Sequence, residues 1–327
     1  MNRTKTTRAF AAILLAVPLC SIASAYEYDA SDPAQGAGMQ APWRSYAKWD
    51  TVDELSTKEI HQFTTEARYI TPMVSYVPED PTVPSPRDVL GHIAGAEGIL
   101  THPDEEARYF RALDEASPRV TVQVMGHTEE GREILLAIVT SEENMARLEE
   151  FKGYSRRLAD PRGVSAEEAM EISQKCKPIM HITAGLHSPE TGSPEMVMEL
   201  AYRVAVSDHP DIVQMRDNVV LLITPVIEVD GRARVVEWNR RFLEKYDDLR
   251  YMPSYSPPYW GEHAFHDNNR DGIQISQELT KAVYREYFRW HPTVMLDLHE
   301  SVPLLYISTG TGPYNETLDP LTIVPST

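Results

Sequence analysis

The chain has 327 residues, of which 49 are Asp or Glu and 31 are Lys or Arg, so its formal net charge is −18 at pH 7. This strong negative charge argues against nucleic acid and against an anionic membrane surface as partners. The length suits one α/β domain with an extension.

The first 25 residues have the pattern of a secretory signal peptide. Three basic residues precede an apolar run at residues 9–19, and the small residues Ala23 and Ala25 are typical of a signal-peptidase site. The apolar run is too short for a helix that spans a membrane. We therefore expect residues 1–25 to be removed and the protein to be secreted or periplasmic.

Residues 26–85 are polar and irregular, and they end in a cluster of prolines between residues 78 and 86. Proline disrupts both helix interiors and central strands. The segment predicts either an extended N-terminal arm or a first layer packed on the rest of the domain, and the sequence leaves both open.

From residue 86 onward the apolar residues recur regularly. Alternating or continuous apolar runs predict strands at 119–126, 134–140, 178–183, 219–224 and 293–298, the first two forming a hairpin. Helical spacing and capping residues predict helices at 104–115, 142–158, 165–176, 194–206 and 276–290. This alternation predicts an α/β fold with a mainly parallel or mixed sheet and helices on both faces. Residues 232–274 show little periodicity and are too long for an ordinary connection, so we expect a functional segment there.

A candidate metal site begins directly after the predicted strand 178–183. His187 and Glu190 lie on the connection to the next helix, and binding residues of open α/β sheets gather at such strand ends. Another histidine, His299, closes the strand 293–298, which lies 109 positions beyond Glu190. Two histidines and a glutamate form a ligand set that catalytic zinc uses with an open fourth position. The other interpretation is a capped loop with a solvated carboxylate and hydrogen-bonded structural histidines.

With these residues the sequence resembles the zinc carboxypeptidase family, the carboxypeptidase A-like metallopeptidases. The family pattern is H-x-x-E, a long gap and a histidine at a strand end, and His187, Glu190 and His299 match it. The resemblance implies Zn²⁺ as the cofactor, these three residues as its ligands at the carboxyl ends of the strands, and a peptide or protein substrate with a free C-terminus. It implies that residues 86–327 are a catalytic domain of this family.

Two further segments carry the resemblance. Asp267-Asn268-Asn269-Arg270 resembles the family's D-x-N-R segment, which implies that Asn269 and Arg270 bind the substrate's terminal carboxylate and that Asp267 orients His187.

The segment that includes Arg240 and Arg241 resembles the region that supplies the arginine polarising the scissile carbonyl. For these arginines the alternative is an ordinary solvated charge. His263 and His266 are rival metal ligands on a predicted loop.

The family's general-base glutamate and its substrate-capping tyrosine lie well after the third ligand, and we identify neither here. Glu300 should point away from His299 on a strand and is a poor substitute. We therefore expect a truncated domain. The leading hypothesis is a zinc-dependent metallocarboxypeptidase that hydrolyses C-terminal peptide bonds. The alternatives are a zinc amidohydrolase or deacylase of the same fold, and a non-catalytic peptide-binding protein.

Overall fold

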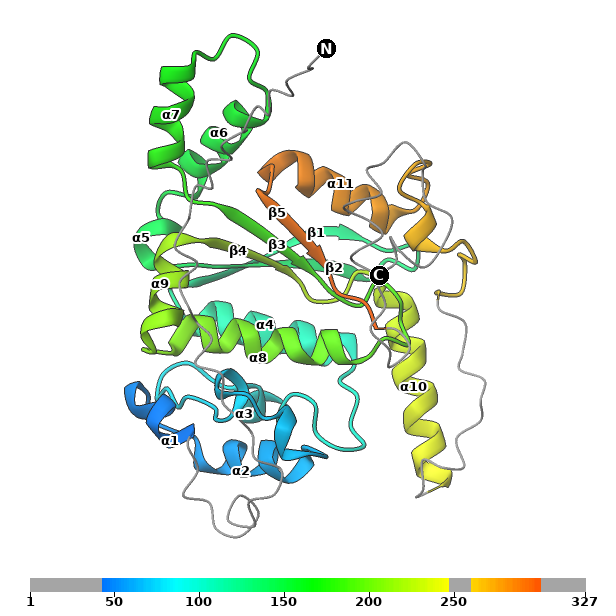
Figure 1. Cartoon of the computed structure of the whole chain (residues 1–327). Coiled ribbons are helices and arrows are strands. Elements are labelled where there is room, and N and C mark those ends of the chain that lie inside the picture. Colours follow the sequence, from blue (N-terminus) through cyan, green and yellow to red (C-terminus); the bar gives the residue numbers. More distant parts are fainter. Residues whose placement is uncertain (1–42, 247–259, 301–327) are drawn as a thin grey trace, which may run out of the picture. The chain divides into compact units, whose positions relative to one another are not determined.

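The computed structural model describes residues 43–246 and 260–300 (Figure 1). The predicted signal peptide and the residues that follow Glu300 lie outside these ranges. Within them, no helix is long and apolar enough to cross a membrane.

Five strands form one mixed sheet in the order β1-β2-β4-β3-β5. β1 (Val120–His127) and β2 (Glu133–Val139) form the predicted antiparallel hairpin. β4 (Val220–Thr224) pairs antiparallel with β2 and parallel with β3 (Ile179–Thr183), and β5 (Val294–Asp297) runs parallel to β3. The predicted α/β fold with a mixed sheet is confirmed, and β3, β4 and β5 end at the same edge of the sheet.

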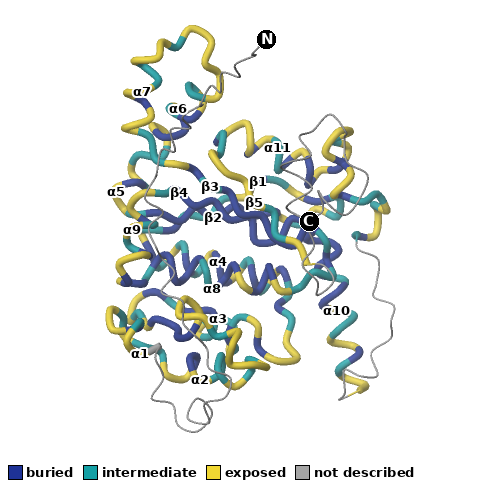
Figure 2. Tube along the Cα trace, in the orientation of Figure 1, coloured by how far each residue is buried: buried dark blue, intermediate teal, exposed yellow. Residues whose placement is uncertain are grey.

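Helices cover both faces of this sheet because the side chains of each strand alternate between two cores. Ala137 and Val139 of β2 point into the core shared with α4 (Pro103–Ala116) and α8 (Gly192–Val206). Leu136 and Ile138, which alternate with them, point into the core shared with helices on the other face, α6 (Leu148–Ala159) and α11 (Glu278–Trp290). Figure 2 shows the central strands as the most deeply buried part of the chain.

The predicted helix at 142–158 is two helices, α5 (Glu142–Met145) and α6. The predicted helix at 165–176 is α7 (Ala166–Lys175), and Ser165 caps it by accepting a hydrogen bond from the amide of Glu168. α9 (Pro210–Asn218) leads into β4.

Residues 43–85 do not form the extended N-terminal arm. They form the other structure that the sequence allowed, a first layer packed on the rest of the domain. They form α1 (Trp43–Tyr46), η2 (Ala47–Trp49), α2 (Glu54–Phe63), η3 (Ala67–Tyr69) and η4 (Pro72–Val74), and α3 (Pro86–Leu90) follows. The Tyr202 hydroxyl of α8 donates a hydrogen bond to the Pro78 carbonyl, and the buried Tyr76 and Val77 lie against the same helix region. This segment therefore forms a layer that packs on α8.

The expectation of an irregular segment at 232–274 is wrong for its first part, because α10 (Val229–Lys245) is a regular helix. Its buried face includes Asp230 and Arg232 together with Val229 and Val236. These charged residues hide the apolar period in the sequence, because they are buried by pairing with other charges, which periodicity cannot detect.

Candidate metal centre

The metal-ligand candidates lie where β3 and β5 end. After β3 the chain turns at Gly185, which has a φ of +61° and whose added Cβ would lie 3.1 Å from the Pro194 side chain. Only glycine adopts this backbone without strain. The turn carries His187 and Glu190 to the start of α8, while His299 follows two residues after the end of β5.

The structure brings the three side chains together. His187 Nδ1 lies 2.9 Å from one oxygen of the Glu190 carboxylate, and His299 Nδ1 lies 3.0 Å from the other. One ligand atom from each residue can be chosen so that all lie within 4.8 Å of one another. The side chains are 18%, 15% and 33% exposed for His187, Glu190 and His299, so the cluster is open on the His299 side.

Each imidazole has an aspartate on its other nitrogen. Asp267 lies 3.7 Å from His187 Nε2, as the resemblance implies for the orienting carboxylate. Asp297 lies 2.9 Å from His299 Nε2, and the Thr183 hydroxyl donates a 2.7 Å hydrogen bond to it. We did not predict Asp297, although its position two residues before His299, on the same face of a strand, is a usable signal.

This donor set fits zinc. A metal-ligating histidine commonly donates its second ring N–H to a carboxylate, which fixes its tautomer and its orientation. Both histidines present Nδ1 to Glu190 and Nε2 to an aspartate. Two imidazole nitrogens and a carboxylate leave a fourth position open for a reacting group.

A buried amide joins the segments around this centre. Asn268 donates hydrogen bonds from Nδ2 to the Leu186 carbonyl, at 2.6 Å, and to Glu228 Oε2, at 3.0 Å. Glu228 also caps α10 by accepting from the amide of Gly231, and burial raises the pKa of Glu228 to about 7. Asn268 therefore ties the turn that carries Asp267 to the residue that precedes His187.

The two residues predicted to bind a carboxylate lie in the same turn, η6 (Asn268–Arg270). Asn269 and Arg270 are exposed, and Arg270 donates a 3.1 Å hydrogen bond to the Asn269 carbonyl. Asp267 caps the turn by accepting from the amide of Asn269. The structure thus brings both residues next to the aspartate that faces His187.

The other arginine candidates are occupied elsewhere. Arg240 donates to Glu105 at 2.6 Å and to the Leu100 carbonyl at 3.3 Å, which joins α10 to the start of α4. Arg241 is exposed and lies 3.8 Å from Glu237, one turn earlier. Neither guanidinium contacts the His187, Glu190 and His299 cluster in the described part of the chain.

The rival histidines also stand apart. Within residues 43–246 and 260–300, the one group of side chains that could hold a metal ion is His187, Glu190 and His299. His266 pairs with Asp271 at 3.3 Å instead.

Glu300 accepts a 2.5 Å hydrogen bond from the Gly192 amide, so its carboxylate lies at the N-terminus of α8, where the helix dipole favours negative charge.

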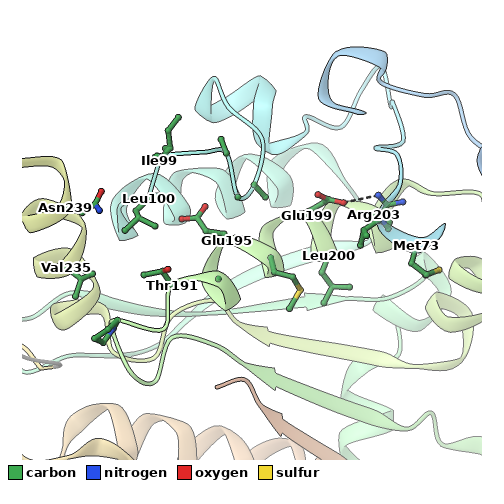
Figure 3. Close-up of a pocket in the computed structure, with 18 of the residues that line it drawn as sticks. Met73, Ile99, Leu100, Thr191, Glu195, Glu199, Leu200, Arg203, Val235 and Asn239 are labelled. Carbon is green, nitrogen blue, oxygen red and sulfur yellow. Dashed lines mark hydrogen bonds and ion pairs between the residues drawn. The ribbon is translucent and has the colours of Figure 1, made fainter. Parts of the chain in front are cut away.

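A pocket of about 840 Å³ lies beside the turn that carries Glu190, and we call it the α8 pocket (Figure 3). Pro189, Thr191 and Gly192 form one wall, and Met196 and Leu200 of α8 extend it. The remaining walls come from the 94–100 segment, from Met73 and Val74, from Ile212 and Met215 of α9, and from Val235, Trp238 and Asn239 of α10. Sequence patterns did not indicate this pocket, since its walls come from segments far apart in the chain.

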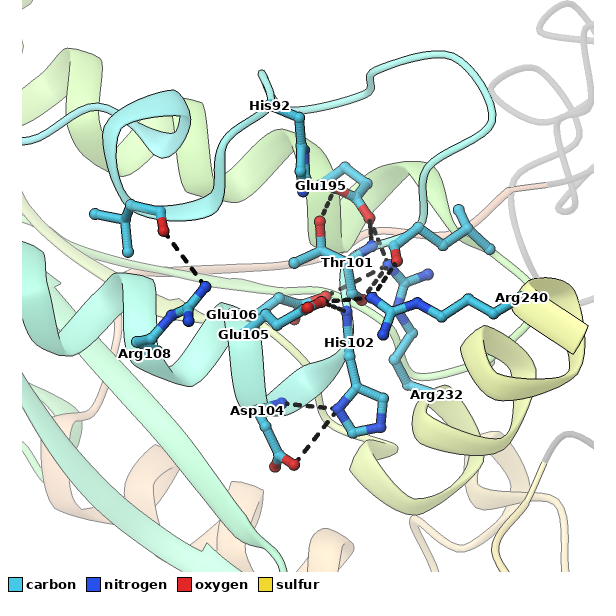
Figure 4. A network of polar contacts seen from close by, with 12 residues as sticks. His92, Thr101, His102, Asp104, Glu105, Glu106, Arg108, Glu195, Arg232 and Arg240 are labelled. Carbon is cyan, nitrogen blue, oxygen red and sulfur yellow. Dashed lines mark hydrogen bonds and ion pairs between the residues drawn. The ribbon is translucent and has the colours of Figure 1, made fainter. Parts of the chain in front are cut away.

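Glu195, which lines the α8 pocket, belongs to a buried charge network (Figure 4). Its carboxylate accepts from the amide and the hydroxyl of Thr101, both at 2.7 Å, and from Arg232 at 2.7 Å. Glu106 lies farther from Arg232, at 3.4 Å, and burial raises the pKa of Glu106 to about 8. The Arg232 guanidinium therefore pairs with Glu195, while Glu106, with its raised pKa, keeps its proton at neutral pH.

The model of the zinc carboxypeptidase family matches residues 107–317, which is more than half of the chain. A carboxypeptidase A from Helicoverpa armigera is 18% identical, with a TM-score of 0.37, over 62% of this chain and 46% of that one. A metallo-carboxypeptidase from Burkholderia cenocepacia is 17% identical, with a TM-score of 0.41, over 63% of this chain and 43% of that one. The chain spans less than half the length of these two structures. No curated protein matches the sequence.

Proposed function

Because the chain belongs to the zinc carboxypeptidase family, we propose that it is a zinc-dependent metallocarboxypeptidase that hydrolyses C-terminal peptide bonds. The observation that supports this most is the convergence of His187, Glu190 and His299 within 4.8 Å. These residues would hold the ion, and zinc, when bound, polarises a scissile carbonyl.

The surrounding residues would position the ligands and the substrate. Asp267 and Asp297 would keep each imidazole in the tautomer that leaves Nδ1 free to bind the ion. Asn269 and Arg270 would bind the terminal carboxylate, because a guanidinium fork matches its two oxygens. The proximity of η6 to His187 through Asp267 supports this role.

We keep Arg240 and Arg241 as the candidates that stabilise the oxyanion. Arg240 would have to exchange its contact with Glu105 for one with substrate. Arg240→Ala should therefore lower kcat more than it raises KM, whereas an unchanged kcat would assign this arginine to the joint between α10 and α4.

Zinc content tests the metal centre. We expect about one zinc per chain in the wild type, as in a mononuclear site, and substoichiometric zinc in His187→Ala and His299→Ala, measured by elemental analysis after dialysis. His266→Ala is the matched control and should keep its zinc. Unchanged zinc in His187→Ala would contradict the assignment.

Substrate class is tested with paired peptides that differ only in a free or an amidated C-terminus. Release of the last residue from the free acid alone supports a carboxypeptidase, and Arg270→Ala should raise KM for that peptide. Hydrolysis of N-acyl amino acids instead of peptides would favour the amidohydrolase alternative. Binding of the free acid without turnover would favour the non-catalytic alternative.

We also propose that the protein is exported, on the strength of its N-terminal sequence pattern. N-terminal sequencing of the protein from the extracellular or periplasmic fraction should begin at Tyr26. A chain that keeps Met1 in that fraction would contradict the proposal.

A further inference from the structure

We propose that Asp271 is a positioning residue for substrate binding, because it holds the backbone of η6 in the shape that presents Arg270 to the terminal carboxylate. This inference rests on the proposed carboxypeptidase function and deepens it. It assigns part of the substrate recognition to a buried residue that touches no substrate.

The side chain of Arg270 has little support of its own. Arg270 is exposed, and its guanidinium donates a 3.1 Å hydrogen bond to the carbonyl of the preceding residue, Asn269. An exposed guanidinium that is held by a neighbouring carbonyl takes its position from the backbone that carries it. Whatever fixes the backbone of η6 therefore also fixes where Arg270 can meet a carboxylate.

Asp271 ends η6 directly after Arg270, and its hydrogen bonds fasten the turn to the rest of the fold. Its amide donates to the Asn268 carbonyl at 3.1 Å, within the turn. Its carboxylate accepts from the Ser276 amide at 3.1 Å, from the Ser276 hydroxyl at 2.5 Å and from the Gln277 amide at 2.9 Å. Because Gln277 directly precedes α11, these bonds join the end of η6 to the start of a helix.

Further contacts join the chain before η6 to the chain after it. Gln277 Nε2 donates to the His266 carbonyl at 2.8 Å, and His266 Nε2 lies 3.3 Å from Asp271 Oδ1. The Tyr284 hydroxyl of α11 donates to the Gly272 carbonyl at 2.7 Å. Asp271 thus contacts both the entry to the turn and the exit from it.

The burial of the Asp271 carboxylate is costly for the fold. Asp271 is 0% exposed, and in the described part of the chain no lysine or arginine pairs with it. Burial by itself raises the pKa of Asp271, but hydrogen bonds from Ser276 and Gln277 outweigh this effect and leave the pKa below its usual range. The group is therefore a buried charge that hydrogen bonds alone compensate. Asparagine caps a helix about as well as aspartate, so capping of α11 does not by itself require this charge.

Backbone strain lies in the same segment. Ile275, five positions after Arg270, has a φ of +52°. A β-branched residue avoids this region because its Cβ crowds the following carbonyl. The Ile275 amide donates to the Asp271 carbonyl at 2.7 Å, which holds the residue there. Strained backbone persists where its surroundings over-determine it, and it is concentrated at functional sites. The strain and the buried charge together indicate that this segment is shaped for function at the expense of stability.

The main test is a double-mutant cycle on the full, zinc-loaded chain, with KM and kcat measured on a peptide that has a free C-terminus. Asp271→Asn keeps the shape of the side chain and one acceptor, but it removes the charge and one accepting oxygen. We expect KM to rise about tenfold, the equivalent of about 1.4 kcal/mol. We expect kcat and zinc content to stay unchanged, because binding that is lost equally in the ground state and the transition state raises KM alone.

The second arm of the cycle repeats the substitution in Arg270→Ala. There Asp271→Asn should leave KM unchanged, because no guanidinium remains to be misplaced. An equal rise of KM in both backgrounds would overturn the proposal, and so would a wild-type KM in the single variant Asp271→Asn.

Two further variants keep the test informative if Asp271→Asn does not fold. Ser276→Ala removes the 2.5 Å hydrogen bond to the carboxylate and should raise KM by a smaller factor; an unchanged KM would then decide against the proposal. Asp53→Asn is the matched control, because Asp53 caps α2 with the same chemistry, accepting from the Ser56 amide at 2.9 Å and from the Ser56 hydroxyl at 2.5 Å. It should lower the melting temperature without changing KM. A rise of KM in Asp53→Asn as large as that in Asp271→Asn would show a general effect of lost capping and overturn the positioning role.

A binding measurement separates this inference from the proposed function. The probe is a fluorescent peptide whose last peptide bond is replaced by a CH2–NH link, which cannot be hydrolysed, prepared with a free and with an amidated C-terminus. We expect the wild type to bind the free acid with a Kd about tenfold lower than that for the amide, and Asp271→Asn to lose this preference.

The outcomes distinguish the two proposals. If the wild type carries zinc but hydrolyses no peptide, the carboxypeptidase assignment fails, while loss of the preference in Asp271→Asn still supports the positioning role. A preference that survives in Asp271→Asn would overturn the positioning role alone. A wild type without the preference would overturn both the carboxylate-binding role of Arg270 and the role of Asp271.

Discussion

Replacing Asn268 with alanine should weaken zinc binding although Asn268 is not a ligand. Its buried amide joins the Leu186 carbonyl to the Glu228 carboxylate. Without it, the residue before His187 and the turn that carries Asp267 lose the hydrogen bonds that join them through Asn268. We infer that Asn268 would act as a positioning residue, since its hydrogen bonds reach the candidate metal centre only through Leu186 and Glu228.

The magnitude follows from the two hydrogen bonds that are lost. A neutral hydrogen bond contributes about 0.5–1.5 kcal/mol and one to a charged group about 1.5–3 kcal/mol. Asn268→Ala removes one to the Leu186 carbonyl and one to Glu228, so above the Glu228 pKa of about 7 we expect the free energy of unfolding to fall by about 2–4.5 kcal/mol. Loss of groups that orient metal ligands typically lowers metal affinity about 10–100-fold, and we expect a change of this size.

The assay uses zinc Kd from competition with a chromophoric chelator, the visible spectrum of the cobalt-substituted protein, and urea unfolding of the metal-free chain. Asn144→Ala is the matched control, because Asn144 is equally buried and donates to Thr140 Oγ1 and to the carbonyls of Arg216 and Asp217. It should lose stability but keep its zinc Kd and cobalt spectrum. If Asn268→Ala loses stability and yet binds zinc like the wild type, the positioning role is refuted.

Three further predictions concern stability. Burial raises the pKa of Glu106 from 4.5 to about 8, so the stability that protonated Glu106 contributes is complete below pH 4.5 and is lost as the pH rises through about 8. Glu106→Gln should therefore flatten the curve of unfolding free energy against pH between these two values. A curve with the wild-type slope would contradict the argument from burial. Chelation with EDTA should lower the melting temperature of the wild type but not that of His187→Ala, because bound zinc at 100 times its Kd adds about 2.7 kcal/mol to the free energy of unfolding. An equal shift in both proteins would place the metal elsewhere. Gly185→Ala should destabilise the fold by about 1–2 kcal/mol in urea unfolding, since φ is +61° and the new Cβ lies 3.1 Å from Pro194; wild-type stability would show that the turn can relax.

The sequence by itself indicated the strands and the three residues that converge as candidate metal ligands. Strands such as 178–183 are short apolar runs bounded by turn residues. A strand that is covered on both faces of a sheet needs apolar side chains at nearly every position, whichever helices cover it, so the run is visible in the sequence alone. His187, Glu190 and His299 were found because each follows the end of such a strand, and parallel strands bring those ends to one edge.

Only the tertiary structure decided how charged residues are used. An arginine such as Arg232 is expected at the surface from its charge, but here it is fully buried and donates hydrogen bonds to Glu195 and to the Thr101 carbonyl, which lie in distant segments. The apolar period of α10 was therefore hidden, and the sequence did not predict this helix. Likewise the pairing of β5 with β3 brings the Thr183 hydroxyl to Asp297, the aspartate that faces His299. A periodic pattern records which residues avoid water locally, whereas the partner that makes a buried charge or amide stable comes from elsewhere in the chain.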